Sequence, residues 1–437
     1  MAIRAVFVLS LLFGKSVNLV NSQSSFYVAF FPGSYNDSTT TSDHHNSLFI
    51  SSSVSEAGTT CNISYDDDSR QEITININPN LVTKHELPAK TRMSSGVKIA
   101  NKGVRVQCSK NVSLYGLSDG DFTAIPTESL SQEYIVPGFQ SNSFLGVVGT
   151  SENTTLDIFI KSTCSYKYGG TAYGNGDVLT VLLQENDVLQ ITDQDQASGD
   201  GCDLGGSRIV ASSKVSVFSG TVYYEDGGSH FFLQVPPLAA FSTETIVPRV
   251  QTSYPRKNII RVIAAKNYTI LYLPRSTRVL MSGDFVDSTF NFTEDQVITS
   301  LLPVLVTQTC LFGPSGGFST VVPGQDLYQN DYLIQVLGKD LRQEDPYLTV
   351  ISKTSAIRDL KVNGVYPNNI NWVNVTRAPV PYSVGDLHID AGQQLHISST
   401  SPIFVREHEY NMKNTHGYIG GYDIPRDTSS NHQGRFG

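Results

Sequence analysis

The chain has 437 residues, of which 39% are hydrophobic and 16% are charged, and its formal net charge is −9. Charged residues make up about a quarter of an average soluble domain, and Val, Ile, Thr, Tyr, Phe and Ser are abundant here. This composition favours strands and tight turns, and it excludes a coiled coil, a helical bundle and a disordered polar chain. No cluster of Lys or Arg stands out, so nucleic acid and anionic membrane surfaces are not expected partners.

The first 22 residues are typical of a secretory signal peptide. Arg4 precedes an apolar run over 5–13, and Val20 and Ser22 supply the small residues of a cleavage site before Gln23. This run is too short to span a membrane, and no later segment reaches the roughly 18 apolar residues that a span requires. We therefore expect a secreted protein that is not inserted in a membrane.

An internal repeat organises the rest of the chain. Residues 103–115 align without gaps with 206–218, and residues 126–137 align with 237–248 in the same order. Two weaker copies follow, so that the repeated element begins near residues 103, 206, 294 and 392. This spacing is about the length of a small β-sandwich unit.

Each copy combines alternating apolar residues with a Ser-rich break. In the second copy the alternation passes through Ile209, stops at 212–214 and resumes at Val215. Period-two alternation predicts half-buried strands, and the break predicts a tight turn between two of them. Further strands are predicted over 26–31, 144–148, 155–160, 259–263, 268–273 and 332–336.

The predicted fold is therefore all-β, with about four repeated β-sandwich-like units and minimal helix. In chain order we expect a signal peptide over 1–22, units over 23–137, 138–248, 249–330 and 331–425, and a polar tail over 426–437.

The five cysteines suggest disulfides within units, because disulfides are the default in an oxidising compartment. Cys61 and Cys108 fall in the first unit and Cys164 and Cys202 in the second, so pairing within each unit is the simplest hypothesis. Cys310 is left over, and it is either free and buried or linked to a second chain in a disulfide-bonded dimer.

Seven sequons agree with an exported and glycosylated chain. The candidate sites are Asn36, Asn62, Asn111, Asn153, Asn267, Asn291 and Asn374.

No motif assigns a catalytic or metal site. Ser315 lies in a Gly-x-Ser-x-Gly pattern but without the strand-turn-helix context of a hydrolase, so we interpret it as a turn residue. Glu407 and Glu409 would share one face of a strand, whereas a glycosidase needs two carboxylates across a cleft. The acidic stretches 66–68 and 193–200 are compatible with a weak surface calcium site, and no other cofactor is expected.

Two segments resemble the N-terminal domain family of IgG Fc-binding protein. They are 203–220, which contains one copy of the repeat, and 230–248, which contains His230-Phe-Phe-Leu-Gln-Val-Pro-Pro237 and Ile246-Val247-Pro248. The resemblance implies a secreted, β-rich interaction module of mucus, adhesion and surface proteins. It brings no catalytic motif to this chain.

The resulting functional prediction is a non-enzymatic extracellular binding or adhesion protein that recognises proteins, glycans or microbial surfaces through loops at the ends of the sandwiches. A glycan-acting hydrolase and a structural matrix or mucus component are the alternatives. Tyr418 and Tyr422 also fit a role as caps of a core. The candidate binding residues are Tyr173, Asn175, Asp193, Asp195, Tyr410, Tyr418 and Tyr422.

Overall fold

The computed structural model describes most of the chain between residues 24 and 425. The described ranges are 24–33, 46–52, 56–66, 72–79, 81–118, 120–140, 142–192, 201–224, 229–273, 276–313, 316–337, 346–390, 392–410 and 415–425. The expected signal peptide and polar tail lie outside them.

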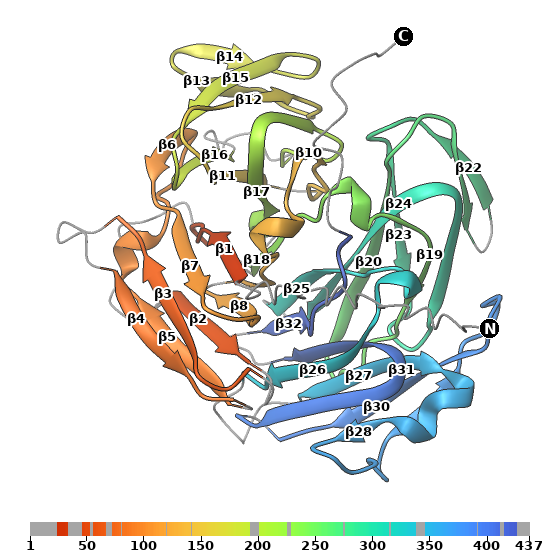
Figure 1. Cartoon of the computed structure of the whole chain (residues 1–437). Helices are drawn as coiled ribbons and strands as arrows, with labels where there is room; N and C mark the ends of the chain where they lie inside the picture. The colour runs from red at the N-terminus through yellow and green to blue at the C-terminus, as the bar shows by residue number, and fades with distance from the viewer. Residues whose placement is uncertain are drawn as a thin grey trace, which may run out of the picture.

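The strands form four groups around a common centre (Figure 1). Group 1 contains β1 (Ser24–Val28), β2 (Asn46–Ser51), β3 (Thr59–Ser64), β4 (Ile73–Ile77), β5 (Val82–Leu87), β7 (Val104–Cys108), β8 (Ser113–Leu117) and β9 (Asp121–Thr123). Group 2 contains β10 (Ser131–Ile135), β11 (Ser143–Gly149), β12 (Thr154–Phe159), β13 (Tyr166–Tyr168), β14 (Thr171–Tyr173), β15 (Val178–Leu183), β16 (Asp187–Thr192), β17 (Arg208–Tyr224) and β18 (Ser229–Gln234), and its main sheet also receives β6 (Lys98–Asn101).

The second half of the chain repeats this plan. Group 3 contains β19 (Ser242–Val247), β20 (Pro255–Ala264), β21 (Thr269–Leu273), β22 (Ser276–Leu280), β23 (Phe285–Phe290), β24 (Gln296–Phe312) and β25 (Gly316–Val321). Group 4 contains β26 (Gln329–Gln335), β27 (Tyr347–Lys353), β28 (Lys361–Val362), β29 (Asn371–Asn374), β30 (Tyr382–His388), β31 (Gln394–Glu409) and β32 (His416–Ile419).

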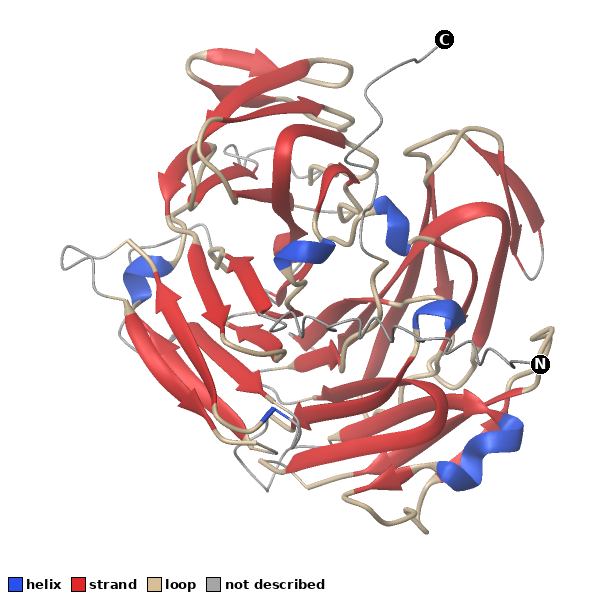
Figure 2. Cartoon of the chain, in the orientation of Figure 1, coloured by secondary structure: helices blue, strands red, loops and turns tan. Residues whose placement is uncertain are grey.

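Strands dominate the described residues, and the helices among them are short 3-10 helices (Figure 2). They are η3 (Ala89–Thr91), η4 (Thr127–Ser129), η6 (Leu238–Ala240), η7 (Gln325–Leu327) and η8 (Thr354–Asp359). None of them is long and apolar enough to cross a membrane.

Each group is a sandwich whose two layers share one core. In group 2, Leu145 of β11 and Leu156 of β12 belong to the same buried cluster, although β11 and β12 pair with opposite halves of β17. Alternation along the strands produces this arrangement, because every second side chain of each layer points to the shared interior. The predicted all-β fold of sandwich-like units is confirmed.

A long, bent strand connects the two layers of groups 2, 3 and 4. The first half of β17 pairs with β10 and β12, and its second half pairs with β11 and β18. Ser131 of β10 pairs with Val215 of β17, whereas Glu133 pairs with Val210, and this shift in register marks the bend in β17. The tight turn predicted at 212–214 is therefore wrong: β17 continues through the break and changes layer there. In group 1 the equivalent strand is interrupted between β7 and β8.

The aligned segments 126–137 and 237–248 adopt the same local structure. Pro126 precedes η4 and β10, and Pro237 precedes η6 and β19, with the proline at the N-cap of the 3-10 helix in both cases. Between groups 3 and 4, Gly324 occupies the N-cap position of η7 in place of a proline.

The last strands of the groups close the molecule into a ring. β9 contacts β18, β18 contacts β25, β25 contacts β32, and β32 contacts β9. By strand pairing, β10 and β19 begin groups 2 and 3, since they pair with β17 and β24. The unit boundaries expected from the repeat, 23–137 and 138–248, instead assign both strands to the ends of the preceding units.

Candidate ligand-binding surface

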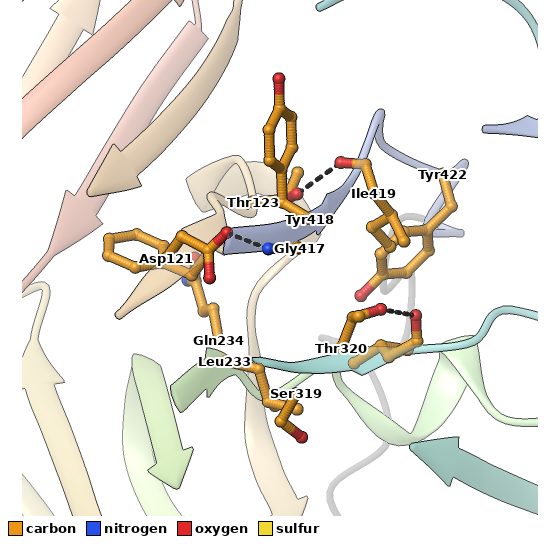
Figure 3. A pocket seen from close by; sticks show the side chains of 12 residues that line it. Asp121, Thr123, Leu233, Gln234, Ser319, Thr320, Gly417, Tyr418, Ile419 and Tyr422 are labelled. Atoms are coloured by element: carbon orange, nitrogen blue, oxygen red, sulfur yellow. Dashed lines mark hydrogen bonds between the residues drawn. The ribbon is translucent and has the colours of Figure 1, made fainter. Parts of the chain in front are cut away.

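The centre of the ring contains a small pocket of about 20 Å³ (Figure 3). A volume of this size holds about one water molecule, whereas small-molecule sites are usually several hundred Å³. Asp121 accepts a hydrogen bond from the Gly417 N–H at 2.9 Å, and the Thr123 hydroxyl donates to the Ile419 carbonyl at 2.6 Å. These bonds join β9 to β32, so the polar groups at the centre close the ring. The lining residues are Asp121, Phe122, Thr123, Leu233, Gln234, Ser319, Thr320, Val321, Gly417, Tyr418, Ile419 and Tyr422.

Glu407 and Glu409, the carboxylates considered for hydrolysis, are buried in β31. Neither carboxylate oxygen of Glu407 has a hydrogen-bond partner among the described residues. Burial raises the pKa of Glu407 well above its usual value, and the charges of Glu409 and Asp121 raise it further. Burial also raises the pKa of Asp121 to about 7. These groups lie in the protein interior rather than on the two sides of an open cleft, as glycoside hydrolysis requires.

The predicted tyrosines at the C-terminal end are mostly buried. Tyr410 packs on Phe312 and Tyr254, with ring centroids 5.7 and 4.8 Å apart. Tyr418 is buried in β32, where its hydroxyl accepts the Gln335 N–H at 3.0 Å. The expectation of exposed aromatic side chains is therefore wrong for these two residues. The alternative role of Tyr418 as part of a core is what the structure shows, and Tyr422 is half-buried beside the central pocket.

The predicted loop residues of group 2 are divided between surface and core. Tyr173 ends β14 and packs, half-buried, against the core of group 2. Asn175 is exposed, and its side-chain oxygen accepts the Ser162 N–H at 3.4 Å. Asp193 and Asp195 lie outside the described residues, as do Ser315 and most of the acidic stretches considered for calcium. Among the described positions, no group of three or more His, Cys, Asp and Glu residues is placed to bind a metal.

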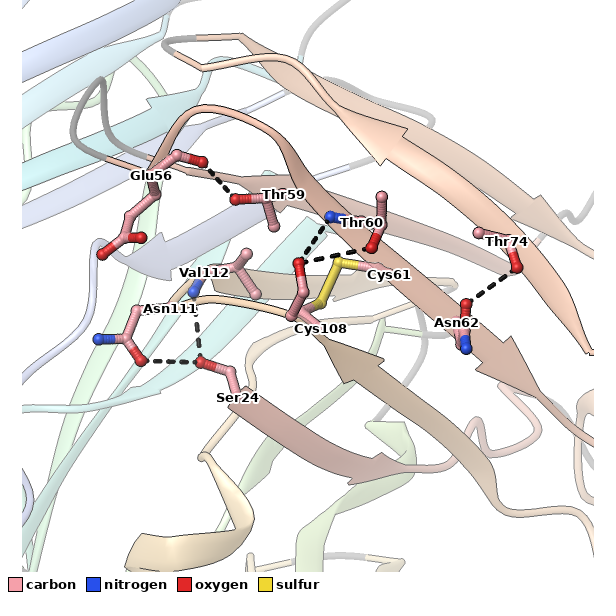
Figure 4. Close-up of a disulfide and its surroundings, with 11 residues drawn as sticks. Ser24, Glu56, Thr59, Thr60, Cys61, Asn62, Thr74, Cys108, Asn111 and Val112 are labelled. Carbon is pink, nitrogen blue, oxygen red and sulfur yellow. Dashed lines mark hydrogen bonds between the residues drawn. A yellow bond between two sulfur atoms is a disulfide. The ribbon is translucent and has the colours of Figure 1, made fainter. Parts of the chain in front are cut away.

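Each of the two disulfides joins two cysteines of the same group. Cys61 of β3 is disulfide-bonded to Cys108 of β7, near the hydrogen bond from the Ser24 hydroxyl to the Asn111 side chain (Figure 4). Cys164 is disulfide-bonded to Cys202. This is the pairing that the repeat predicts. Cys310 is free and fully buried in β24, where burial raises its thiol pKa to about 12. A disulfide to a second chain would therefore require this thiol to leave the core.

The sequon asparagines of the described residues lie at or near the surface. Asn62 is half-buried on β3, and its side-chain oxygen accepts the Thr74 hydroxyl at 2.9 Å. Asn36 lies outside the described residues. The exposed sites are Asn111, Asn153, Asn267, Asn291 and Asn374.

An exposed cluster of large apolar side chains covers the outer hairpin of group 3. The hairpin consists of β21 and β22, in which Ile270 pairs with Val279. Tyr272 pairs with Thr277 of β22 on one side and with Thr299 of β24 on the other. Directly paired residues share a face, so these side chains belong to one outward surface. We call it the outer aromatic patch; its members and exposed fractions are Tyr268 (70%), Tyr272 (46%), Val279 (64%), Met281 (40%) and Leu301 (59%).

Tyr268 also has an unusual backbone conformation. Its φ is +60°, and Asn153 at the equivalent turn of group 2 has a φ of +56°. The turns match because Thr154 donates to the Ser151 carbonyl and Thr269 to the Lys266 carbonyl, at 2.9 and 2.7 Å. Asn tolerates this left-handed region, whereas a bulky residue there costs about 1–2 kcal/mol. Such strain clusters at functional positions, which makes the exposed Tyr268 ring a candidate contact residue.

The sequence of 268–273 predicts a strand but does not by itself predict this patch. The available signal was that apolar residues occupy both parities of the segment, as in Ile270, Leu271, Tyr272 and Leu273. A strand that is apolar on both faces is either covered on both sides or exposes one apolar face. The sequence does not say which, because that depends on the neighbouring groups.

Comparison with known proteins agrees with this architecture. The IgGFc binding protein family model matches residues 120–406, from the start of β9 through most of β31. The IgGFc-binding protein of Homo sapiens is 24% identical over 364 residues, an alignment that covers 78% of this chain and 6% of the human protein. The matched region is thus a small part of that relative. Since the family model covers more than half of the sequence, the chain belongs to the IgGFc-binding protein family.

Proposed function

We propose that the protein is a secreted extracellular binding protein that recognises another macromolecule through the outer aromatic patch of group 3. Family membership supports binding as the general activity. The patch carries the more specific part of the proposal, because five large apolar side chains remain at least 40% exposed on the β21–β22 hairpin and the adjacent strand β24. Apolar patches that a soluble protein leaves exposed are typical of interaction sites.

The chemistry of the patch suits recognition of a protein surface. Tyrosine is enriched among residues that dominate binding energy, because its ring buries a large apolar area while its hydroxyl still forms hydrogen bonds. Here two tyrosines lie beside Val279, Met281 and Leu301, and the hairpin backbone holds them in place. Such a surface can form an apolar contact centre with a polar rim.

The Fc part of immunoglobulin G is the first partner to test, because the human relative bears the name IgGFc-binding protein. Glycans and microbial surfaces are the further ligand classes to include. A mucosal role for this chain belongs to the same proposal, as do glycosylation at the exposed sequons and export by the N-terminal segment.

Binding of the full, secreted chain to immobilised Fc fragments, measured by biolayer interferometry, tests this proposal. Fab fragments and a glycan array serve as the other targets. The double variant Tyr272→Ser/Val279→Ser should weaken binding by roughly thirtyfold, because loss of a dominant contact costs about 2 kcal/mol. Val380→Ser is the matched control, since Val380 is a 49% exposed valine of group 4 outside the patch and its replacement creates no new sequon.

Retention of wild-type affinity by the Tyr272→Ser/Val279→Ser protein, with an unchanged circular dichroism spectrum, would refute the patch as the binding site. Absence of binding to Fc together with binding to a glycan would transfer the proposal to that ligand class.

A further inference from the structure

The strand β15 forms an open edge of the largest sheet. It lies at one end of the eight-stranded sheet, where β12 pairs with one side of it. Among the residues that the structure describes, no strand pairs with the other side. The backbone N–H and C=O groups on that side are therefore available to another strand.

The side chains of β15 make this edge apolar and uncharged. The sequence of the strand is Val-Leu-Thr-Val-Leu-Leu, and its residues alternate between exposed and buried. Val178 is 42% and Leu182 is 52% exposed, and Phe159 of β12, which pairs with Val178, is 41% exposed. Soluble proteins usually protect such an edge with charged residues or proline.

Several other edge strands are protected by charged or polar residues. β22 contains Arg278, and β5 contains both Lys84 and Glu86. β4 exposes Thr74 and Asn76 instead of apolar residues. The edge strand β29 is also uncharged and exposes Val373 (44%), but β15 differs from it in exposing two large apolar side chains on one face.

The sequence of β15 is complementary to itself in an antiparallel arrangement. A two-fold axis at Thr180 places Val178 opposite Leu182 of a second copy, and Leu179 opposite Val181 of that copy. Apolar residues therefore meet apolar residues on both faces. Asp177 falls opposite Leu183, so no like charges meet at the ends of the strand.

We propose that two copies of this chain associate through antiparallel pairing of their β15 strands. The pairing joins two eight-stranded sheets into one continuous sheet and brings Val178 and Leu182 of one copy against Leu182 and Val178 of the other on its outer face. A second copy is the occupant because the exposed apolar side chains Val178 and Leu182, which are similar in size, face each other across the two-fold axis. This interface lies on group 2, apart from the outer aromatic patch of group 3, so either proposal can fail independently.

The test is the mass of the full, secreted protein in solution, measured by size-exclusion chromatography with light scattering and by sedimentation velocity over a range of concentrations. The wild-type protein should show a monomer–dimer equilibrium. Val178→Lys alone and Leu182→Glu alone should each shift it to monomer by at least tenfold, because each places a charge against an apolar residue. The double variant Val178→Lys/Leu182→Glu should restore the dimer, since it places opposite charges against each other at both ends.

Thr155→Lys, compared with Thr155→Ala, is the matched control, because Thr155 is exposed on the same face but lies on β12, one strand inside the edge, and both variants lack the Asn153 sequon. It should leave the dimer intact. A wild-type protein that remains monomeric at every concentration overturns the proposal. So does a dimer that survives both single variants, or a double variant that is folded but stays monomeric.

Discussion

Arg261 provides the sharpest test of how the groups are held together. Its guanidinium donates two hydrogen bonds to Asp287 of its own group, at 2.7 Å each, and two to Asp203 of group 2, at 3.0 and 2.8 Å. A fifth bond reaches the Pro137 carbonyl at 2.9 Å, and the guanidinium lies 3.9 Å from the centre of the Phe285 ring. Burial lowers the pKa of Arg261, but its bonds and charges with the two carboxylates raise it overall. The side chain therefore stays charged.

Replacement of Arg261 by Met should destabilise the protein by about 3–5 kcal/mol. The reason is that the side chain of Arg261 is 5% exposed and those of Asp203 and Asp287 are 11% and 19% exposed. Removing the cation leaves two largely buried carboxylates without compensation, and breaking a buried ion pair costs this much. The further replacements Asp203→Asn and Asp287→Ala should recover part of the loss, because they remove those charges without creating a new sequon.

Urea denaturation followed by circular dichroism measures this change. Arg208→Met is the matched control, since Arg208 forms a 2.7 Å ion pair with Glu133 while both side chains remain more than 40% exposed. An exposed pair contributes about 0–1 kcal/mol. If Arg261→Met costs no more than Arg208→Met, the argument that this buried arginine joins groups 2 and 3 is refuted.

Three further predictions concern buried groups. Burial raises the folded-state pKa of Glu407, so its contribution to stability is fully present below pH 4.5 and is lost as the pH rises through the folded-state value. Glu407→Gln should remove that loss, and the variant should therefore gain stability relative to wild type between pH 4.5 and 8 in urea titrations. Parallel curves of stability against pH for the two proteins would contradict this. Replacement of Cys61 and Cys108 by Ala should cost about 4 kcal/mol by the chain-entropy estimate for a separation of 47 residues, measured by the same denaturation, whereas a loss below 1 kcal/mol would show that the bond is not needed. Cys310 should resist iodoacetamide in the native protein at pH 8 and react after denaturation, because its pKa is about 12 and it is buried; rapid native labelling detected by mass spectrometry would disprove its placement.

Local sequence patterns account for the strands and for the repeated plan. Alternation of apolar residues is a property of single strands, because neighbouring side chains point to opposite faces. It therefore located several strands of the sandwiches, including the segments around Ile209 and Val215. The Pro-led segments at 126 and 237 were recognisable for the same local reason, since a proline fixes the turn that starts each 3-10 helix. Cysteine pairing followed once the repeat placed two cysteines in each of the first two groups.

The same patterns failed where the outcome depended on distant residues. The break at 212–214 became a bend instead of a turn, because β10 and β12 pair with one half of β17 while β11 and β18 pair with the other. Tyr410 and Tyr418 became buried because β25 and β9 pack against the C-terminal strands. Aromatic residues near a polar C-terminal segment resemble a binding loop in the sequence, and only the ring closure shows that they belong to the interior.

The sequence by itself therefore determined an all-β chain of sandwich-like units with intra-unit disulfides, because these features depend on residues within one strand, one turn or one repeat. The tertiary structure decided which surfaces remain available for binding. The outward face of β21 and β22 and the free edge of β15 are defined by what does not pack against them. Burial of a side chain is set by its neighbours in space, and the positive φ of Tyr268 is set by the turn that the surrounding strands impose.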